Sequence, residues 1–415
     1  MIPSDRLDYA VWPIFYQMQQ RGIAVSMDRL TTLRAEIIER RYEQELMLEE
    51  FAGRAIDPAK NAEVAAWLES VYPHGKRTKV SKARATDKRT LEQYPQHPVI
   101  DCVLEWRGLN KALSTFIDPV IQIAHLSGGV LHPKWKLTRV KSGRVACEDP
   151  NLLAFPVRDD LGKRVRSCFV ARSGFSMCSV DFSQLEPRIV AAFSRDPKLL
   201  EMYASGRDIY QETATALGVS RLVSKILTLG IIYGMGAARL EEQLMQAGCV
   251  DSEGLAVYDL PACEALIQRW FETYPWVAEF IKDTVAKARY ASGWAYTEDG
   301  RGRYLPGLFL TGDGWPAGKL REEAERQAFN HLIQGTGMEQ LKKAMIRVVS
   351  EVPPRCPPDV HMLLAIHDEL IFEVPECAAD TYAKNLSGII SVPDFHGVEL
   401  KTITTVGPDW GSLKG

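Results

Sequence analysis

Two short apolar segments, far apart in the chain, each carry an aspartate at a strand end. The first, FSMCSVDF (175–182), contains Asp181, and the second, HMLLAIHDELIFEV (361–374), contains Asp368. Apolar runs of this length, rich in branched and aromatic residues, predict buried strands. If both strands belong to one sheet, the largely helical stretch between them must leave that sheet and return to it. The chain is therefore predicted to have an α+β fold, with elements in the order helices, sheet, helices, sheet.

The composition argues against several classes of protein. The chain has 415 residues, of which 46% are hydrophobic, enough for one large unit or two to three domains. No apolar run is long enough for a membrane span, and the N-terminus lacks the pattern of a signal peptide. The eight cysteines form no C-x-x-C pair, so we expect free thiols in a reducing compartment.

Positive charge is concentrated locally, although the net charge is only −3. Residues 76–89 (KRTKVSKARATDKR) and 134–144 (KWKLTRVKSGR) are rich in Lys and Arg, and residues 73–89 are expected to form a mobile basic loop. A solvated surface is the ordinary explanation of such runs. Contact with a nucleic-acid backbone is the alternative, because binding a duplex requires several phosphate contacts.

Hydrophobic periodicity predicts several helices and hairpins. Ser26 is a suitable N-cap for a helix over 27–51, whose apolar stripe is Leu30, Leu33, Ile37, Ile38 and Tyr42. The other elements predicted in this way are helices over 99–125 and 322–350 and β-hairpins over 293–305 and 361–374.

Asp181 and Asp368 are the first candidates for a functional site. Either aspartate alone is more simply explained as a helix cap or a turn residue. However, His367, Asp368 and Glu369 form a polar triplet between two apolar strands, where acids are costly unless a partner offsets their charge. Two Mg²⁺ ions, or Mn²⁺ in their place, would offset that charge and would support phosphoryl transfer.

A predicted helix between the two aspartates carries the next candidates. Arg221, Lys225, Leu229 and Tyr233 recur at steps of four residues and therefore share one broad helical face. Such a face suits a triphosphate and a base, and Lys225 is placed to protonate a departing pyrophosphate. An exposed basic face is the ordinary alternative.

Arg326, Asn330 and Gln334 follow the same spacing on the long helix near the C-terminus. A guanidinium and two amides on one face suit minor-groove acceptors and a primer backbone. A solvated polar face is again the alternative.

At these positions the chain resembles family A DNA polymerases, the DNA polymerase I (Klenow-like) group. The segments similar to motifs A, B and C are, in order, DFSQLEPRIVAAFSRD, RLVSKILTLGIIYG and IHDEL. The segments similar to the primer-contacting segment, the template-contacting helix and the thumb are SGRVACEDPNLLAFPVR, ERQAFNHLIQGTG and EWRGLNKALSTFIDPV. The resemblance extends from about residue 8 to residue 415, with the motifs in the family's order.

The resemblance implies a right-hand polymerase with a helical thumb, an antiparallel-sheet palm and helical fingers. Its parts would be an N-terminal segment with the thumb (1–130), the first part of the palm (131–196), the fingers (197–292) and the second part of the palm (293–415). The implied activity, in DNA replication or repair, is template-directed addition of dNTPs to a primer 3′-end by two-metal nucleotidyl transfer.

The resemblance also implies roles for individual residues. The implied catalytic residues are Asp181, Asp368, Glu369 and Lys225, and the implied metal ligands are Asp181, Phe182 through its carbonyl, and Asp368. The residues implied to bind the dNTP are Gln184, Glu186, Tyr210, Arg221, Lys225, Leu229 and Tyr233. Among these, Glu186 would be the steric gate that excludes a ribose 2′-hydroxyl. The residues implied to contact DNA are Arg144, Asn151, Gly234, Arg326, Asn330, Gln334 and His367.

Four positions depart from the family's pattern. Leu229 stands where Phe or Tyr is usual, so we expect poor acceptance of dideoxynucleotides. Tyr210 stands where a His near the β-phosphate is usual, so a hydrogen bond remains without a positive charge. Leu153 and Ala154 stand where a Gln-Asn pair near the minor groove is usual.

Two other functions remain open at this point. A single-subunit RNA polymerase shares this plan, but Glu186 argues against it. A non-catalytic nucleic-acid-binding relative of a polymerase is the second alternative, and Asp181, Lys225 and Asp368 argue against it. No segment of 1–415 resembles an exonuclease domain, so we expect no proofreading by this chain.

The expected partners are primer–template DNA and dNTPs, without a membrane. We expect a monomer, with a separate exonuclease or processivity factor as a further candidate partner. The expected location is the cytoplasm of a bacterial or phage-infected cell.

Overall fold

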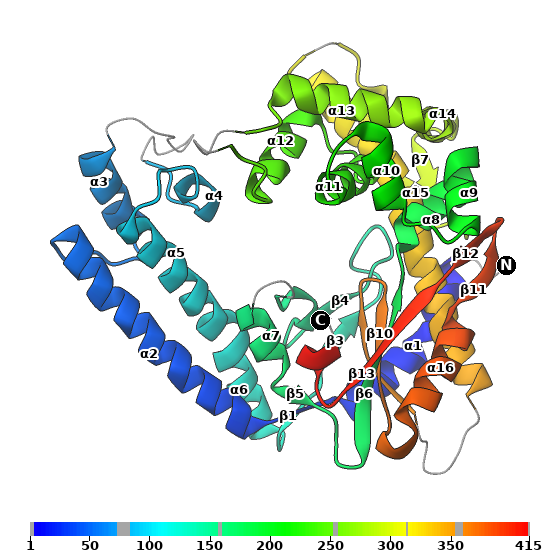
Figure 1. Cartoon of the computed structure of the whole chain (residues 1–415). Coiled ribbons are helices and arrows are strands. Elements are labelled where there is room, and N and C mark those ends of the chain that lie inside the picture. The colour runs from blue at the N-terminus through cyan, green and yellow to red at the C-terminus, as the bar shows by residue number, and fades with distance from the viewer. Residues whose placement is uncertain are drawn as a thin grey trace. The chain divides into compact units, whose positions relative to one another are not determined.

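The computed structural model describes residues 4–72, 84–156, 160–251, 256–312, 314–352 and 360–413 (Figure 1). The chain divides into two compact units, each assembled from several segments. The first unit comprises Met1–Arg21, Lys134–Glu148 and Gly174–Val406, and the second comprises Gly22–Pro133, Asp149–Ser173 and Gly407–Gly415. Most of the predicted basic loop, residues 73–83, lies outside the described residues.

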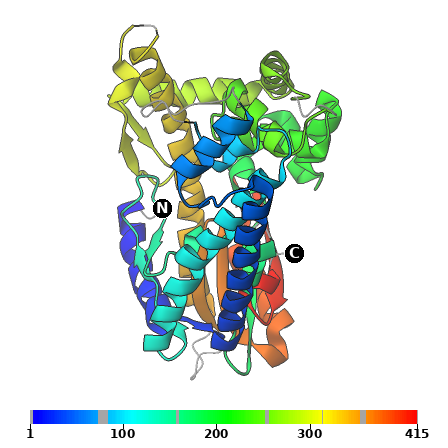
Figure 2. The same ribbon diagram turned by 90° about the vertical axis from the view of Figure 1, so that its left-hand side faces the viewer.

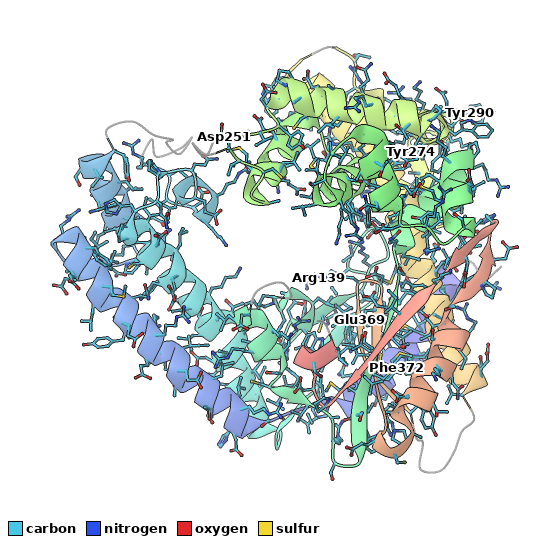
Figure 3. The ribbon with its side chains drawn as sticks, in the orientation of Figure 1. Arg139, Asp251, Tyr274, Tyr290, Glu369 and Phe372 are labelled. Atoms are coloured by element: carbon cyan, nitrogen blue, oxygen red, sulfur yellow. The ribbon has the colours of Figure 1, made fainter. Side chains whose placement is uncertain are left out.

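A four-stranded sheet in the order β13-β6-β10-β9 forms the centre of the first unit (Figure 1). Its strands are β6 (Phe175–Phe182), β9 (His361–Ile366), β10 (Glu369–Pro375) and β13 (Thr402–Gly407). β10 runs antiparallel to both β6 and β9, so the strands predicted at 175–182 and 361–374 do share one sheet. Phe372 on β10 is fully buried, as expected for strands of this composition (Figure 3).

Helices of the first unit pack on this sheet or around it. They include α1 (Ser4–Arg21), α8 (Leu185–Ser194), α15 (Ala317–Glu351) and α16 (Ala379–Ile390). α16 contacts β6 and β10, whereas α1 contacts β9 and α15. In this interior the Lys342 ammonium donates to Asp8 at 2.6 Å and to the Gly143 carbonyl at 2.8 Å. A charge buried so completely is tolerated because it is paired and hydrogen-bonded.

Further helices of the first unit follow α8 in the chain. They are α9 (Pro197–Ala204), α10 (Ile209–Leu217), α11 (Arg221–Ile232), α12 (Ala237–Gln246), α13 (Leu260–Thr273) and α14 (Pro275–Tyr290). The Trp270 ring packs in their core, and its indole N–H donates to the Thr228 hydroxyl at 3.1 Å. Within the described residues, no single helix is long and apolar enough to cross a membrane; α10 and α11, bent by 104°, pass that test only as a pair.

Three small hairpins complete the first unit. They pair β3 (Lys134–Lys136) with β4 (Ala146–Glu148), β7 (Trp294–Tyr296) with β8 (Gly302–Tyr304), and β11 (Val392–Phe395) with β12 (Val398–Leu400). The β7–β8 pair is the hairpin predicted around Asp299 and Gly300.

Long helices that lie side by side form most of the second unit (Figure 2). They are α2 (Met27–Ala52), α5 (Pro98–Lys111), the π-helical η1 (Ala112–Ile117) and α6 (Asp118–Leu126). The Ser26 side chain caps α2 as predicted, accepting the Arg29 amide at 3.4 Å. Tyr42 was predicted incorrectly, because its ring is exposed while Leu30, Leu33 and Ile37 are buried.

Shorter elements of the second unit connect these helices. They are α3 (Asn61–Val71), α4 (Lys88–Leu91), the 3₁₀ helix η2 (Leu152–Ala154), α7 (Asp160–Arg166) and a sheet in the order β2-β1-β5. The strands of that sheet are β1 (Ile23–Val25), β2 (Val130–Leu131) and β5 (Phe169–Val170).

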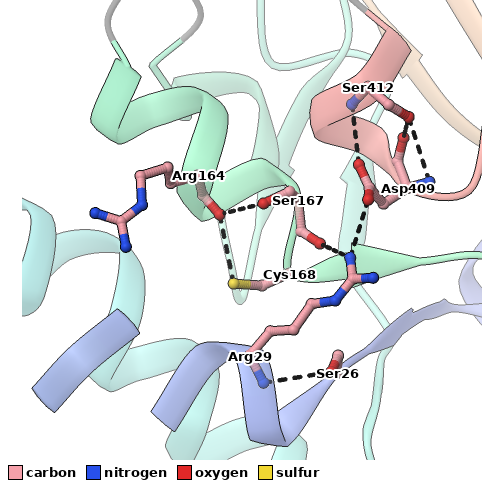
Figure 4. Close-up of polar contacts among 7 residues, drawn as sticks. All are labelled: Ser26, Arg29, Arg164, Ser167, Cys168, Asp409 and Ser412. Atoms are coloured by element: carbon pink, nitrogen blue, oxygen red, sulfur yellow. Dashed lines mark hydrogen bonds and ion pairs between the residues drawn. The ribbon is translucent and has the colours of Figure 1, made fainter. Parts of the chain in front are cut away.

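Asp409 and Ser412, near the end of the described residues, are held by polar contacts in the second unit (Figure 4). The Asp409 carboxylate accepts the Arg29 guanidinium at 2.9 Å and the Ser412 amide at 2.9 Å. Trp410, which is buried, begins the 3₁₀ helix η5 (Trp410–Leu413), and the Arg166 guanidinium lies 5.6 Å from the centre of its ring.

The α+β fold with antiparallel strand pairing is confirmed. The boundaries at residues 130, 196 and 292 between parts of a hand remain a prediction. The compact units are cut at other positions, since α1 groups with the sheet rather than with the helices that follow it.

Candidate active site

Residues from segments far apart in the sequence line one pocket of about 650 Å³ in the first unit. The predicted site residues that line it are Arg144, Asp181, Phe182, Gln184, Glu186, Tyr210, Arg221, Lys225, Leu229, Tyr233, Gln334, His367 and Asp368. The remaining lining residues, which sequence reasoning did not single out, are Ser183, Leu185, Pro187, Gly337, Met338 and Ile403.

Strand pairing brings the two aspartates to the same place. Asp181 lies opposite Glu369 in the antiparallel register of β6 and β10, so it is also close to Asp368, the residue before Glu369. The Phe182 amide donates to the Asp368 carbonyl at 3.1 Å, which holds the two chain segments together at this point. Two carboxylates therefore share the floor of one pocket.

Glu369 has a different position from the two aspartates. It is buried and does not line the pocket, and the Ser179 hydroxyl donates to its carboxylate. Ser179 and Asp181 lie two residues apart on β6 and therefore face the same side of the sheet. Glu369 thus fits a supporting position beneath the pocket rather than a direct contact within it.

The pocket offers oxygen donors to a metal ion. Within the part of the chain that the structure describes, no group of three or more His, Cys, Asp or Glu residues is arranged to hold a metal. Mg²⁺ is commonly held by only one or two carboxylates, with substrate phosphates and water completing its shell. The oxygen donors of Asp181, Asp368 and the Phe182 carbonyl fit such an ion.

The turn after β6 adopts an uncommon backbone conformation. Gln184 has a φ of 55°, in the left-handed region that non-glycine residues rarely adopt. The buried Arg188 fastens this turn, because its guanidinium donates to the Ser183 and Glu399 carbonyls, each at 2.8 Å. The Tyr203 ring stacks on Arg188, 4.5 Å from its guanidinium carbon, and the Tyr203 hydroxyl donates to the Gln184 side chain at 3.2 Å. These contacts fix the turn that carries Gln184, which lines the pocket.

Three side chains meet near the N-terminus of α8. The Arg144 guanidinium donates to the Glu186 carboxylate at 2.7 Å. Burial, and then the nearby Glu186 charge, raise the pKa of the Tyr233 phenol, so this group stays neutral. Glu186 is therefore held between a cation and a phenol.

The predicted face of α11 does point into the pocket. The side chains of Arg221, Lys225 and Leu229 line the pocket. Tyr233, the residue at the C-terminal end of the helix, lines it as well. The Ser220 side chain starts the helix by accepting the Val223 amide at 3.2 Å. Arg221 and Lys225 thus share one pocket with Asp181 and Asp368.

Three predicted DNA-contacting residues lie beside the pocket without lining it. The Asn330 side-chain amide donates to the Tyr233 carbonyl at 3.1 Å. Gly234 has a φ of 69°, and a Cβ built on it would meet the Arg326 Cγ at 2.8 Å. α11 therefore ends directly against the Arg326–Asn330 face of α15.

Asn151, the remaining predicted contact, belongs to the second unit, which is described separately. Its contact with DNA stays a prediction.

Sequence reasoning missed the residues that position the site. Arg188 and Tyr203 hold the turn after β6 in place. Only the folded structure reveals which residues they contact. Asp208 was also missed, although an aspartate is a common N-cap and this one caps α10.

Comparison with known proteins adds independent findings. The sequence model of DNA polymerase family A matches residues 27–412. The chain is 32% identical over 414 residues to a thermostable DNA polymerase I of Thermus filiformis, covering 97% of this chain and 47% of that protein. It is 31% identical over 428 residues to a DNA polymerase I of Deinococcus radiodurans, covering 99% and 42%. The chain therefore spans about half the length of these relatives.

A solved structure is similar along almost the whole chain. It is the POL domain of Pol1 from M. smegmatis in complex with a DNA primer-template and a dNTP. The TM-score is 0.85 at 26% sequence identity, covering 99% of this chain and 71% of the other.

The close approach of Gly234 to Arg326 leads to a prediction for Gly234→Ala. Gly206 is a matched control, since it has the same φ of 69° with no atom within 4 Å of a built Cβ. We expect Gly206→Ala to lower the free energy of unfolding by about 1 kcal/mol, the cost of a left-handed alanine. Gly234→Ala should cost roughly 1 kcal/mol more, because Arg326 must also be displaced. Urea unfolding of both variants checks this, and equal losses would contradict it.

Proposed function

Because this chain belongs to DNA polymerase family A, we propose that it is a template-directed DNA polymerase that adds dNTPs to a primer 3′-end. The observation that carries the proposal is the single pocket in which Asp181 and Asp368 face Arg221 and Lys225. Primer-template DNA and a dNTP are bound in the M. smegmatis structure, which supports the same two partners here.

The two aspartates would hold the divalent metal ions of the reaction. When bound, Mg²⁺ would lower the pKa of the primer 3′-hydroxyl and neutralise charge on the departing pyrophosphate. Asp181 and Asp368 supply the oxygen ligands, and Glu369 stabilises their positions from beneath through the Ser179 contact.

The cations of α11 would bind the triphosphate. The Arg221 guanidinium carries several N–H donors in a plane, a geometry that matches phosphate oxygens. Lys225, one turn further along the helix, is placed to donate a proton to the pyrophosphate as it leaves. Tyr233 at the end of the helix offers a flat face to the new base pair.

Glu186 would select deoxyribose. The Glu186 carboxylate is fixed by Arg144 and lies beside Tyr233. It therefore has little freedom to move aside for the 2′-hydroxyl of a ribonucleotide. This argument favours DNA over RNA as the product and against the single-subunit RNA polymerase alternative. We also propose the hand parts, the monomeric state and the cytoplasmic location expected above, the last supported by the lack of disulfides among the described cysteines.

Primer extension tests the proposed function. The wild type should extend a primed template with Mg²⁺ and dNTPs but not with rNTPs, and Glu186→Ala should increase rNTP use. Asp368→Asn should slow extension at least roughly a thousandfold, because about 4 kcal/mol of lost transition-state stabilisation corresponds to that factor. Its affinity for primer–template, measured by fluorescence anisotropy, should stay close to that of the wild type. Absence of extension by the wild type, or equal use of rNTPs, would refute the proposal.

Leu229 leads to a second prediction, about dideoxynucleotides. Leu229 lines the pocket and supplies no hydroxyl to replace a missing 3′-OH. We expect the wild type to discriminate strongly against ddNTPs, and Leu229→Tyr to reduce that discrimination roughly tenfold, the factor governed by one hydrogen bond. Leu229→Phe, which adds the ring without the hydroxyl, is the matched control and should keep the discrimination high. Equal ratios of dNTP to ddNTP incorporation in all three proteins would contradict this expectation.

A further inference from the structure

Asp208 makes two separate contacts that meet at the nucleotide pocket. Its Oδ1 accepts the Tyr210 amide at 2.9 Å, which caps α10. Its Oδ2 accepts the Arg221 Nε at 2.7 Å. Arg221 and Tyr210 line the pocket, whereas Asp208 is not among its lining residues. One carboxylate that does not line the pocket therefore links the start of α10 to the first residue of α11.

We propose that Asp208 is a positioning residue that orients Arg221 for the triphosphate of the incoming nucleotide. The proposal rests on the function proposed above and deepens it. Asp208 does not line the pocket, and its effect is transmitted through the Arg221 guanidinium.

The atoms used in the contact support orientation rather than blocking. A carboxylate that blocked a guanidinium would engage its outer N–H groups, as bidentate pairs do. Here the bond runs to Nε, the nitrogen nearest the backbone. The Nη groups at the tip of Arg221 are the donors that suit phosphate oxygens.

The ring of Tyr210 restrains the same guanidinium from a second side. The Arg221 guanidinium carbon lies 5.7 Å from the centre of the Tyr210 ring, within the range of a cation–π contact. Tyr210 is itself buried, so the ring is a fixed surface. The Arg221 side chain is about half exposed and would otherwise be free to sample many rotamers.

The helix dipole gives Asp208 a further reason to be charged. Arg221 is the first residue of α11, where the partial positive charge of the helix end repels a cation. The Asp208 carboxylate offsets this repulsion. Partial burial raises the pKa of the Asp208 carboxyl, but the bonds from Arg221 and from the Tyr210 amide outweigh it and lower that pKa overall. Asp208 therefore stays ionised at neutral pH.

The role matters more in this chain because of Tyr210. Burial raises the pKa of Tyr210 to about 12, so the phenol is neutral under assay conditions. With Tyr210 neutral, the grip on the outer phosphates depends on Arg221 and Lys225, and so on how well Arg221 is placed.

Three substitutions separate orientation from helix capping. Asp208→Asn keeps a capping oxygen but loses the charge that holds Arg221. Asp208→Ser also keeps a cap and cannot reach Arg221. Asp208→Glu keeps the charge with a longer side chain and should restore part of the effect.

The direct probe is inorganic tripolyphosphate with Mg²⁺, titrated by calorimetry, because it reports phosphate binding without catalysis. We expect Asp208→Asn and Asp208→Ser to weaken its binding at least roughly fivefold, the scale of one charge-assisted hydrogen bond. In an Arg221→Ala background, Asp208→Asn should have no further effect. In primer extension, Asp208→Asn should raise the KM for dNTP by a similar factor and leave kcat within about twofold, the pattern of lost substrate binding.

Several results would overturn the proposal. Tighter tripolyphosphate binding by Asp208→Asn would mean that Asp208 blocks Arg221. An equal loss of tripolyphosphate affinity when Asp208→Asn is added to Arg221→Ala would mean that Asp208 acts only through the fold. If the wild type does not bind tripolyphosphate, the proposed phosphate site does not exist. If the wild type binds tripolyphosphate as expected but does not extend primers, the proposed function fails while the positioning role of Asp208 stands.

Discussion

The antiparallel pairing of β6 with β10 is the constraint on which the site depends. Residues 175–182 and 369–375 are far apart in the chain, so bringing them together requires closure of a long loop, although this cost grows only slowly with loop length. Burial of apolar side chains such as Val180, Leu370 and Phe372 offsets that cost. The register places Asp181 opposite Glu369, and a slip of one residue would turn Asp181 to the other face of the sheet. Strand register therefore sets which acids share the pocket.

Two nearby carboxylates repel each other, and the surroundings of the pocket limit that cost. Arg221 and Lys225 face the acids from α11, Arg144 neutralises Glu186, and Ser179 holds Glu369 below them. The residual charge of Asp181 and Asp368 is the kind that a divalent ion offsets. The positions of these groups matter as much as their charge. The buried Arg188 accordingly holds the turn at Gln184 in a strained conformation.

Part of this arrangement could be predicted from the sequence. The strands, both hairpins and the shared face of Arg221, Lys225 and Leu229 follow from periods of two and about four residues, which depend only on local geometry. Tyr42 was misassigned because a residue at the edge of an apolar stripe is buried only if a neighbour covers it. The contacts of Arg188 with Glu399 and of Asp208 with Arg221 depend on tertiary structure, which no local pattern encodes.

The central claim, that Asp181 and Asp368 together form a metal site, is tested most directly by Mn²⁺ binding. Electron paramagnetic resonance would measure free Mn²⁺ during titration of the wild type, Asp181→Asn and Asp368→Asn, with Asp283→Asn, an exposed acid on α14, as the control. Each titration would include a dideoxy-terminated primer–template and the matched dNTP. We expect both pocket variants to lose Mn²⁺ affinity at least roughly tenfold, about 1.4 kcal/mol, while the control matches the wild type. Unchanged affinity in both Asp181→Asn and Asp368→Asn would contradict the account.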